Sequence, residues 1–203
     1  MEDFEFKHTE PKTLVDRIAF RMVKLMRIPA DLFFAKRYGH RAIVLETVAA
    51  VPGIVGGMLL HLKSLRLMKP DEGWIHTLLE EAENERMHLM AFVELEQPTL
   101  FERLIVLLAQ GIFFNLYFIA YLINQKLCHR MVGYLEEEAC VSYTEFLKMI
   151  DDDKYPNKEI PDWTKDYWNL GGHARLRELV VAIRQDEAEH RDVNHGFAEK
   201  LGG

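Results

Sequence analysis

Two Glu-x-x-His motifs stand in the sequence, at Glu85–His88 and at Glu187–His190. On a helix, positions i and i+3 lie on one face, so each motif can present a carboxylate and an imidazole to one metal ion. Helical bundles that hold two iron ions use this motif on two helices and a single glutamate on each of two others. The motif alone is weak evidence. A third copy, Glu5–His8, lies outside any strong helical pattern and is expected to be accidental.

A single glutamate precedes each motif on a separate helical segment. Glu46 comes 39 residues before Glu85, and Glu136 comes 51 residues before Glu187. Glu46 stands in the apolar run Ile43–Val51, where an ionised carboxylate is costly unless it is paired or bound to a metal. The alternative for Glu46 is a protonated or salt-bridged structural residue.

Three consecutive glutamates leave a choice of ligand, since only one of them can point squarely into a core. Glu136 shares a helical face with Val132 and Cys140, whereas Glu137 shares a wetter face. We therefore expect Glu136 to be the ligand and Glu137 to lie on a solvated face. Glu138 is expected beside the metal ligands or in a ligand pocket.

Four carboxylates and two imidazoles form a hard donor set dominated by oxygen. Such a set suits iron or manganese better than a structural zinc ion, which favours four nitrogen or sulfur ligands. Bound iron then implies chemistry with dioxygen. The predicted metal ligands are Glu46, Glu85, His88, Glu136, Glu187 and His190.

The segments between prolines and glycines are long and have helical patterns without strand alternation, which predicts an all-α protein. The length of 203 residues suits a single domain, in which residues 1–11 form an extended arm. The two cysteines do not form a disulfide framework. Helices are predicted over 39–68, 71–96, 99–129, 131–150 and 173–201, with a loop over 151–172.

Two predicted helices are long and apolar enough to cross a membrane. Leu104–Ile123 has no charge, and Ala42–Leu60 has one, Glu46. A crossing at Leu104–Ile123 would put the two halves of the ligand set on opposite sides of the membrane. We therefore predict that Ala42–Leu60 is buried in the bundle and that Leu104–Ile123 lies along the membrane surface and enters one leaflet.

The net charge of −7 is unevenly distributed, because residues 12–41 carry +6 and the residues after them carry −10. The basic residues alternate with apolar ones such as Phe20, Met22 and Leu25, which favours an anionic membrane surface over nucleic acid as the partner. The chain opens with Met and acidic residues, which is not the pattern of an import sequence. Either the protein is not imported or this sequence begins after the transit peptide.

At these motifs the sequence resembles the alternative oxidases, from about Pro11 onwards. The blocks that carry the resemblance are Leu-Glu-Thr, Asn-Glu-Arg-Met-His-Leu, Leu-Glu-Glu-Glu-Ala and Asp-Glu-Ala followed by a histidine. They occur in this order, at Leu45–Thr47, Asn84–Leu89, Leu135–Ala139 and Asp186–His190.

The resemblance implies a ferritin-like four-helix bundle that holds two iron ions, hydroxo-bridged when oxidised, with additional membrane-surface helices. It implies a homodimer bound to one leaflet on the matrix face of the mitochondrial inner membrane. The implied activity is oxidation of ubiquinol and reduction of dioxygen to water, insensitive to cyanide and without proton pumping.

The resemblance also implies roles for residues beyond the ligands. Tyr143 matches the family's redox-active tyrosine, and it lies seven residues, or two helical turns, from Glu136; a core aromatic residue is the alternative. Residues expected to orient the ligands are Asn84, Asp186 and Trp168; residues expected at the quinol pocket are Arg41, Leu45, Glu138 and Ala139; and expected dimer contacts are His61, Arg66 and Arg103.

Other functions stay open on the sequence. Another di-iron carboxylate enzyme, such as a hydroxylase or a desaturase, would share the ligands without requiring the block Asn84–Leu89. A plastoquinol oxidase of plastids is expected to carry an insertion before the last helix, for which residues 151–172 are too short. An iron-storage or membrane-surface module would show no turnover.

Overall fold

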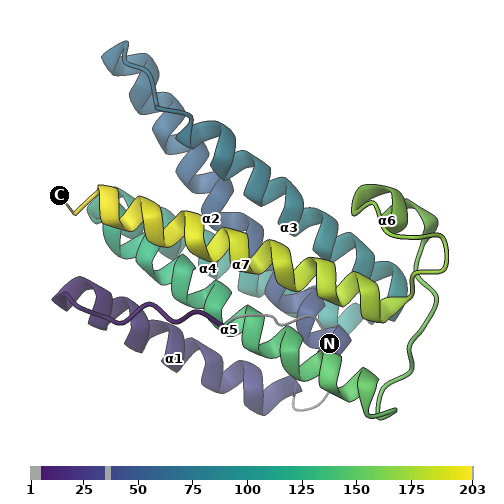
Figure 1. The fold of residues 1–203 in the computed structure, drawn as a ribbon. Coiled ribbons are helices and arrows are strands. Elements are labelled where there is room, and N and C mark those ends of the chain that lie inside the picture. Colours follow the sequence, from purple (N-terminus) through teal and green to yellow (C-terminus); the bar gives the residue numbers. More distant parts are fainter. Residues whose placement is uncertain (1–5, 35–37, 203) are drawn as a thin grey trace. The chain divides into compact units, whose positions relative to one another are not determined.

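The computed structural model describes residues 6–34 and 38–202, with side chains outside 29–38. Within these ranges the chain forms helices and one isolated antiparallel bridge, between Glu159 and Arg175, which confirms the predicted all-α class (Figure 1). The helices are α1 (Leu14–Phe34), α2 (Tyr38–Leu67), α3 (Trp74–Glu96), α4 (Leu100–Ile123), α5 (Gln125–Asp151), α6 (Asp162–Tyr167) and α7 (Leu176–Lys200).

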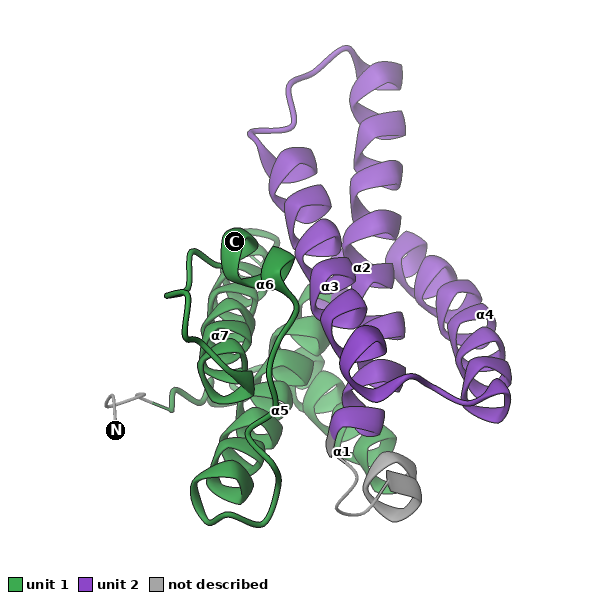
Figure 2. Cartoon of the chain, turned by 90° about the vertical axis from the view of Figure 1, so that its right-hand side faces the viewer, with its two compact units in different colours: residues 1–33, 129–203 green, residues 34–128 purple. Residues whose placement is uncertain are grey.

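The chain divides into two compact units, which are coloured separately in Figure 2. Unit 1 comprises residues 1–33 and 129–203, and it holds α1, most of α5, α6 and α7. Unit 2 comprises residues 34–128 and holds α2, α3 and α4. The single domain expected over residues 1–203 stays a prediction.

In unit 2, α2 packs against both α3 and α4. Glycine permits the close approach of α2 to α3, because a Cβ on Gly53 would lie 2.3 Å from the Leu78 carbonyl oxygen. The helix continues through Pro52. Val51 and Val55 are buried beside these contacts, so α2 forms the core of the unit.

Both α2 and α4 are long and apolar enough to cross a membrane, but their burial differs. In the apolar window of α2, 56% of the residues are buried, against 11% in that of α4. A helix that is apolar all round is stable in water only when its surface is covered. The burial of α2 therefore agrees with a core helix, whereas α4 exposes a continuous apolar face that includes Leu104, Leu107 and Leu108.

The single helix predicted over 99–129 is wrong, because the chain breaks at Asn124. This residue is extended (φ −152°, ψ 93°), and its N–H donates to the Ala120 carbonyl to end α4. Its side-chain oxygen then accepts the Leu127 N–H at 2.9 Å, which caps the start of α5. One asparagine thus satisfies the backbone at two helix ends.

In unit 1, α5 and α7 approach each other closely, since a Cβ on Gly133 would lie 2.6 Å from the His195 ring. The α1 helix is tied to α5 by the buried ion pair of Asp16 and Arg130, at 2.9 Å. The predicted loop over 151–172 contains the short helix α6, which the sequence analysis missed. Just after α6, the Trp168 Nε1–H donates to the Asp186 carboxylate on α7 at 2.7 Å.

Candidate metal centre

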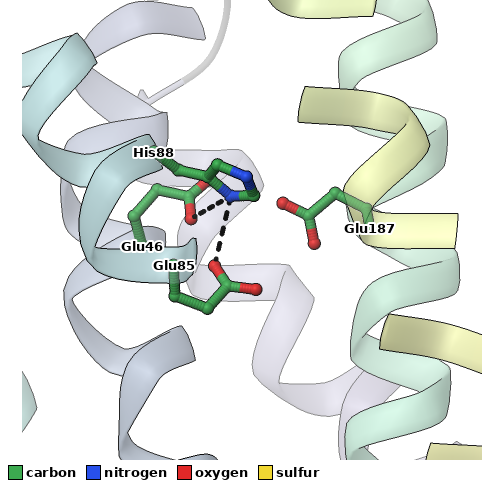
Figure 3. A group of neighbouring side chains, drawn as sticks. All are labelled: Glu46, Glu85, His88 and Glu187. Carbon is green, nitrogen blue, oxygen red and sulfur yellow. Dashed lines mark ion pairs between the residues drawn. The ribbon is translucent and has the colours of Figure 1, made fainter. Parts of the chain in front are cut away.

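Unit 2 brings together the first lone glutamate and the first Glu-x-x-His motif (Figure 3). The His88 Nδ1 atom lies 3.4 Å from a Glu46 oxygen and 3.5 Å from a Glu85 oxygen. Glu46 comes from α2 and the other two residues from α3, and all three side chains are buried. These three residues offer ligand atoms within 4.8 Å of one another, so the group could hold a metal ion. Glu187, also labelled in Figure 3, belongs to unit 1.

The electrostatics of this group favour a bound cation. Burial raises the pKa of Glu46 to about 8, and the nearby Glu85 carboxylate acts in the same direction, while His88 partly opposes both. An ionised carboxylate in this place is therefore unfavourable in the protein alone. A metal ion would supply the missing positive charge, and the carboxylate and imidazole donors suit a hard cation such as iron.

Unit 1 holds the second lone glutamate, Glu136 on α5, and the second motif, Glu187 and His190 on α7, and all three are buried. Two contacts fix the pairing of these helices. Gly133 lies against His195, and the Cys140 thiol lies 3.9 Å from the Arg184 carbonyl.

Because Glu136 falls between these two contacts on α5, it lies at the level of the α7 segment between 184 and 195, which contains Glu187 and His190. Each unit therefore carries one lone glutamate and one Glu-x-x-His motif on neighbouring helices.

Glu137 does not lie on a solvated face, and that prediction is wrong. Its carboxylate accepts the Thr9 N–H at 2.9 Å and lies 2.5 Å from His8 Nδ1 and 2.9 Å from His195 Nε2. Although burial acts to raise the pKa of Glu137, the hydrogen bonds from His195, His8 and Thr9 lower it on balance. The N-terminal arm covers this face of α5, and helical periodicity cannot reveal a segment that packs from elsewhere in the chain.

Of the residues expected to orient the ligands, Trp168 and Asp186 are hydrogen-bonded to each other next to Glu187. Asn84 is half-buried on α3, directly before Glu85, in the other unit. Tyr143 is buried on α5, as a redox-active or a core aromatic residue would be.

The residues expected at the quinol pocket are divided between the units. Arg41 and Leu45 lie one turn apart near the start of α2, with Arg41 buried and Leu45 half-buried. Glu138 and Ala139 are half-buried on α5, and Glu138 forms ion pairs with Lys24 and Arg27 of α1. The basic helix α1 thus neutralises the Glu138 carboxylate.

The residues expected at a dimer contact, His61, Arg66 and Arg103, are all exposed. Around the first two, the outer half of α2 also exposes apolar side chains, among them Met58 and Leu62. Exposed apolar side chains of this kind are typical of a surface that another molecule covers.

A scan of known families matches residues 1–199 to the family described as alternative oxidase. Among curated proteins, the mitochondrial ubiquinol oxidase 2 of Arabidopsis thaliana is 61% identical over 195 residues, which are 96% of this chain and 55% of the relative.

The mitochondrial ubiquinol oxidase of Mangifera indica is 59% identical over 189 residues, 93% of this chain and 59% of the relative. That of Batrachochytrium dendrobatidis is 56% identical over 194 residues, 96% of this chain and 61% of the relative. The chain therefore spans less than two thirds of the length of these relatives.

Proposed function

The chain belongs to the alternative oxidase family, and we propose that it is a quinol oxidase, which oxidises ubiquinol and reduces dioxygen to water at a di-iron centre. The observation that carries the proposal is the pair of buried half-sites, each with one lone glutamate and one Glu-x-x-His motif. The names of the relatives, which are ubiquinol oxidases at about 60% identity, support the choice of substrate.

We further propose that the two half-sites combine into one centre, in which Glu46, Glu85, His88, Glu136, Glu187 and His190 hold two iron ions. The donor set supports this assignment, because four carboxylates offset the charge of two ferrous ions and the imidazoles complete a nitrogen and oxygen environment. When bound, the iron pair supplies the electron exchange with dioxygen.

The remaining residues manage the substrates and protons. Two quinols give up four electrons and four protons, which balance the conversion of one dioxygen to two waters. Arg41 is a permanent hydrogen-bond donor for the oxygen of a quinol head group. Tyr143, which is buried on α5, is assigned the supply of an electron and its phenolic proton, both of which the quinol then restores. The hydrogen bond from Trp168 holds the Asp186 carboxylate beside Glu187.

The proposed setting is the matrix face of the mitochondrial inner membrane, bound through one leaflet. The exposed apolar face of α4 and the basic helix α1, with its exposed Leu14, Ile18 and Leu25, support this proposal. A ubiquinol with a long isoprenoid tail is available only in the lipid phase. Neither helix needs to cross the bilayer for the substrate to reach the site, and no proton is pumped.

We propose a homodimer in which the outer half of α2, including His61 and Arg66, and Arg103 on α4 contact a second copy. The exposed side chains of Ile54, Met58 and Leu62 support an apolar contact there.

The test measures dioxygen uptake by the purified, iron-loaded protein with ubiquinol in the presence of cyanide. We expect sustained uptake at one dioxygen for every two quinols. Uptake that requires a different organic substrate would instead indicate a hydroxylase or a desaturase, and faster uptake with plastoquinol would indicate the plastid type. Binding of iron without any turnover would indicate an iron-storage protein.

A further inference from the structure

The starts of α2 and α4 meet at one buried carboxylate of unit 2, that of Glu102. The side chain is 4% exposed and belongs to the first turn of α4. One of its oxygens accepts hydrogen bonds from the Thr99 backbone N–H and hydroxyl group, both at 2.8 Å, which forms the cap of α4. The other oxygen lies 2.7 Å from Nδ1 of His40, in the first turn of α2.

The start of α2 lacks an acidic residue of its own, although a helix N-terminus favours nearby negative charge. The neighbouring helices supply that charge. Glu102 of α4 contacts His40 directly, and Glu96, the last residue of α3, lies 3.9 Å from the other ring nitrogen of His40.

A glycine beside this pair leaves room for the Glu96 side chain. A Cβ on Gly39 would lie 2.6 Å from Cγ of Glu96. The first turn of α2 is therefore packed tightly against the end of α3, at the position where His40 points toward the two carboxylates.

The contacts of His40 with Glu102 and Glu96 affect the position of Arg41, which follows His40 and lies in the same first turn. Terminal turns of helices fray unless side chains hold them. The guanidinium of Arg41 is buried, so its place depends on the position of that turn. The His40–Glu102 pair connects the turn to α4, the helix that exposes the apolar face.

We propose that the His40–Glu102 pair is a positioning element for Arg41 that sets the affinity of the protein for the quinol head group. The inference rests on the proposed function, which assigns Arg41 to the quinol. Loss of the imidazole leaves the cap of α4 in place, because Thr99 uses the other oxygen of Glu102. The effect is therefore on the first turn of α2 and not on the fold of α4.

The test compares His40→Leu with the wild-type chain in vesicles. We expect the KM for ubiquinol to rise by roughly fivefold to tenfold, which is the range of about one buried polar contact, while kcat and the iron content stay unchanged. The dissociation constant for ubiquinone, measured by calorimetry on the metal-free protein, is expected to rise by the same factor. His40→Gln keeps a polar side chain beside Glu102 and is expected to restore both values.

His76→Leu is the matched control, since His76 forms an exposed contact with Glu80 at 3.1 Å on α3. It removes a histidine–glutamate pair of the same unit and is expected to change neither constant. If His40→Leu fails to fold, His40→Ala serves in its place, because alanine has the highest helix propensity.

A double-mutant cycle tests whether His40 acts through Arg41. If it does, Arg41→Ala with His40→Leu binds quinone no more weakly than Arg41→Ala alone. If the two substitutions raise the dissociation constant for quinone by factors that multiply, the inference is overturned. An unchanged KM in His40→Leu would overturn it as well. A wild-type protein that binds iron but does not oxidise ubiquinol would instead overturn the proposed function, so the two failures are distinguishable.

Discussion

Glu46 is predicted to destabilise the metal-free protein, and Glu46→Gln is the substitution that reveals it. The pKa of this carboxyl is raised from 4.5 to about 8, mainly by burial. Between these two values the folded state binds a proton that the unfolded state has released, so stability falls as pH rises. Glutamine keeps the shape of a protonated glutamate but does not gain a charge on unfolding.

The size of the stability difference follows from the interval between pH 7 and the pKa of 4.5 that the carboxyl has in the unfolded chain. At pH 7 the native carboxyl is protonated about 2.5 units above the pKa of the unfolded chain, and each unit is worth about 1.4 kcal/mol. The variant should therefore be more stable by roughly 3 kcal/mol at pH 7 and by less than about 1 kcal/mol at pH 5. For a chain of this size the difference at pH 7 is about 6–12 °C in Tm.

The assay is thermal or urea unfolding of the metal-free protein at both pH values, and of the iron-loaded protein at pH 7. With iron bound the sign should reverse, because the variant lacks a charged ligand and loses iron. Glu83→Gln is the control, since Glu83 is an exposed partner of Arg86 and should change stability by less than about 0.5 kcal/mol. An equal gain at the two pH values, or no gain at pH 7, would mean that the Glu46 carboxyl is not held protonated in the native protein.

Three further predictions address packing, the arm and the membrane face. Gly53→Ala should cost about 2 kcal/mol or more in urea unfolding, because its Cβ would meet the Leu78 carbonyl, whereas Gly111→Ala, with nothing within 4 Å of its Cβ, should be neutral or stabilising; equal effects would contradict the packing. Glu137→Gln should lower stability at pH 7 by about 1–2 kcal/mol and keep both irons. The difference should shrink as pH falls, since a carboxylate of lowered pKa contributes above the unfolded value and loses its contribution on protonation; an unchanged difference at low pH would argue against the arm contacts. Paired Leu104→Ser and Leu108→Ser should weaken vesicle binding in flotation assays at least about tenfold, because each loses roughly 2 kcal/mol of apolar burial; full retention on vesicles would exclude α4 as the membrane face.

The sequence predicted the helical class and the shared face of Glu85 and His88, because these depend on periodicity and on spacing within single helices. The fixed rise of a helix puts residues three apart on one face, whatever the rest of the chain does. The same reasoning identified α2 as a buried helix, since an ionisable residue in an apolar helix needs a protein environment.

Contacts between distant segments leave no signal in local sequence patterns, so the residues that depend on them were not predicted. Glu137 was assigned to a wet face because its partners, His8 and His195, come from the arm and from α7. The break at Asn124 was missed because the residues on both sides of it are helix formers.

His40 carries no local signal of its contact with Glu102, although the spacing of Thr99 and Glu102 is a recognisable capping box. Such a spacing is a signal for the start of a helix. It does not predict that the same carboxylate also contacts His40 in the first turn of α2.

Electron paramagnetic resonance of the oxidised protein, loaded with two iron ions per chain, tests whether the two proposed half-sites form one centre. Two ferric ions that share carboxylate ligands are magnetically coupled, so we predict a silent spectrum that acquires a signal only on partial reduction. Separate iron ions at Glu46–His88 and at Glu136–His190 would instead give the signal of isolated high-spin ferric iron in the fully oxidised protein, and that result would contradict the account.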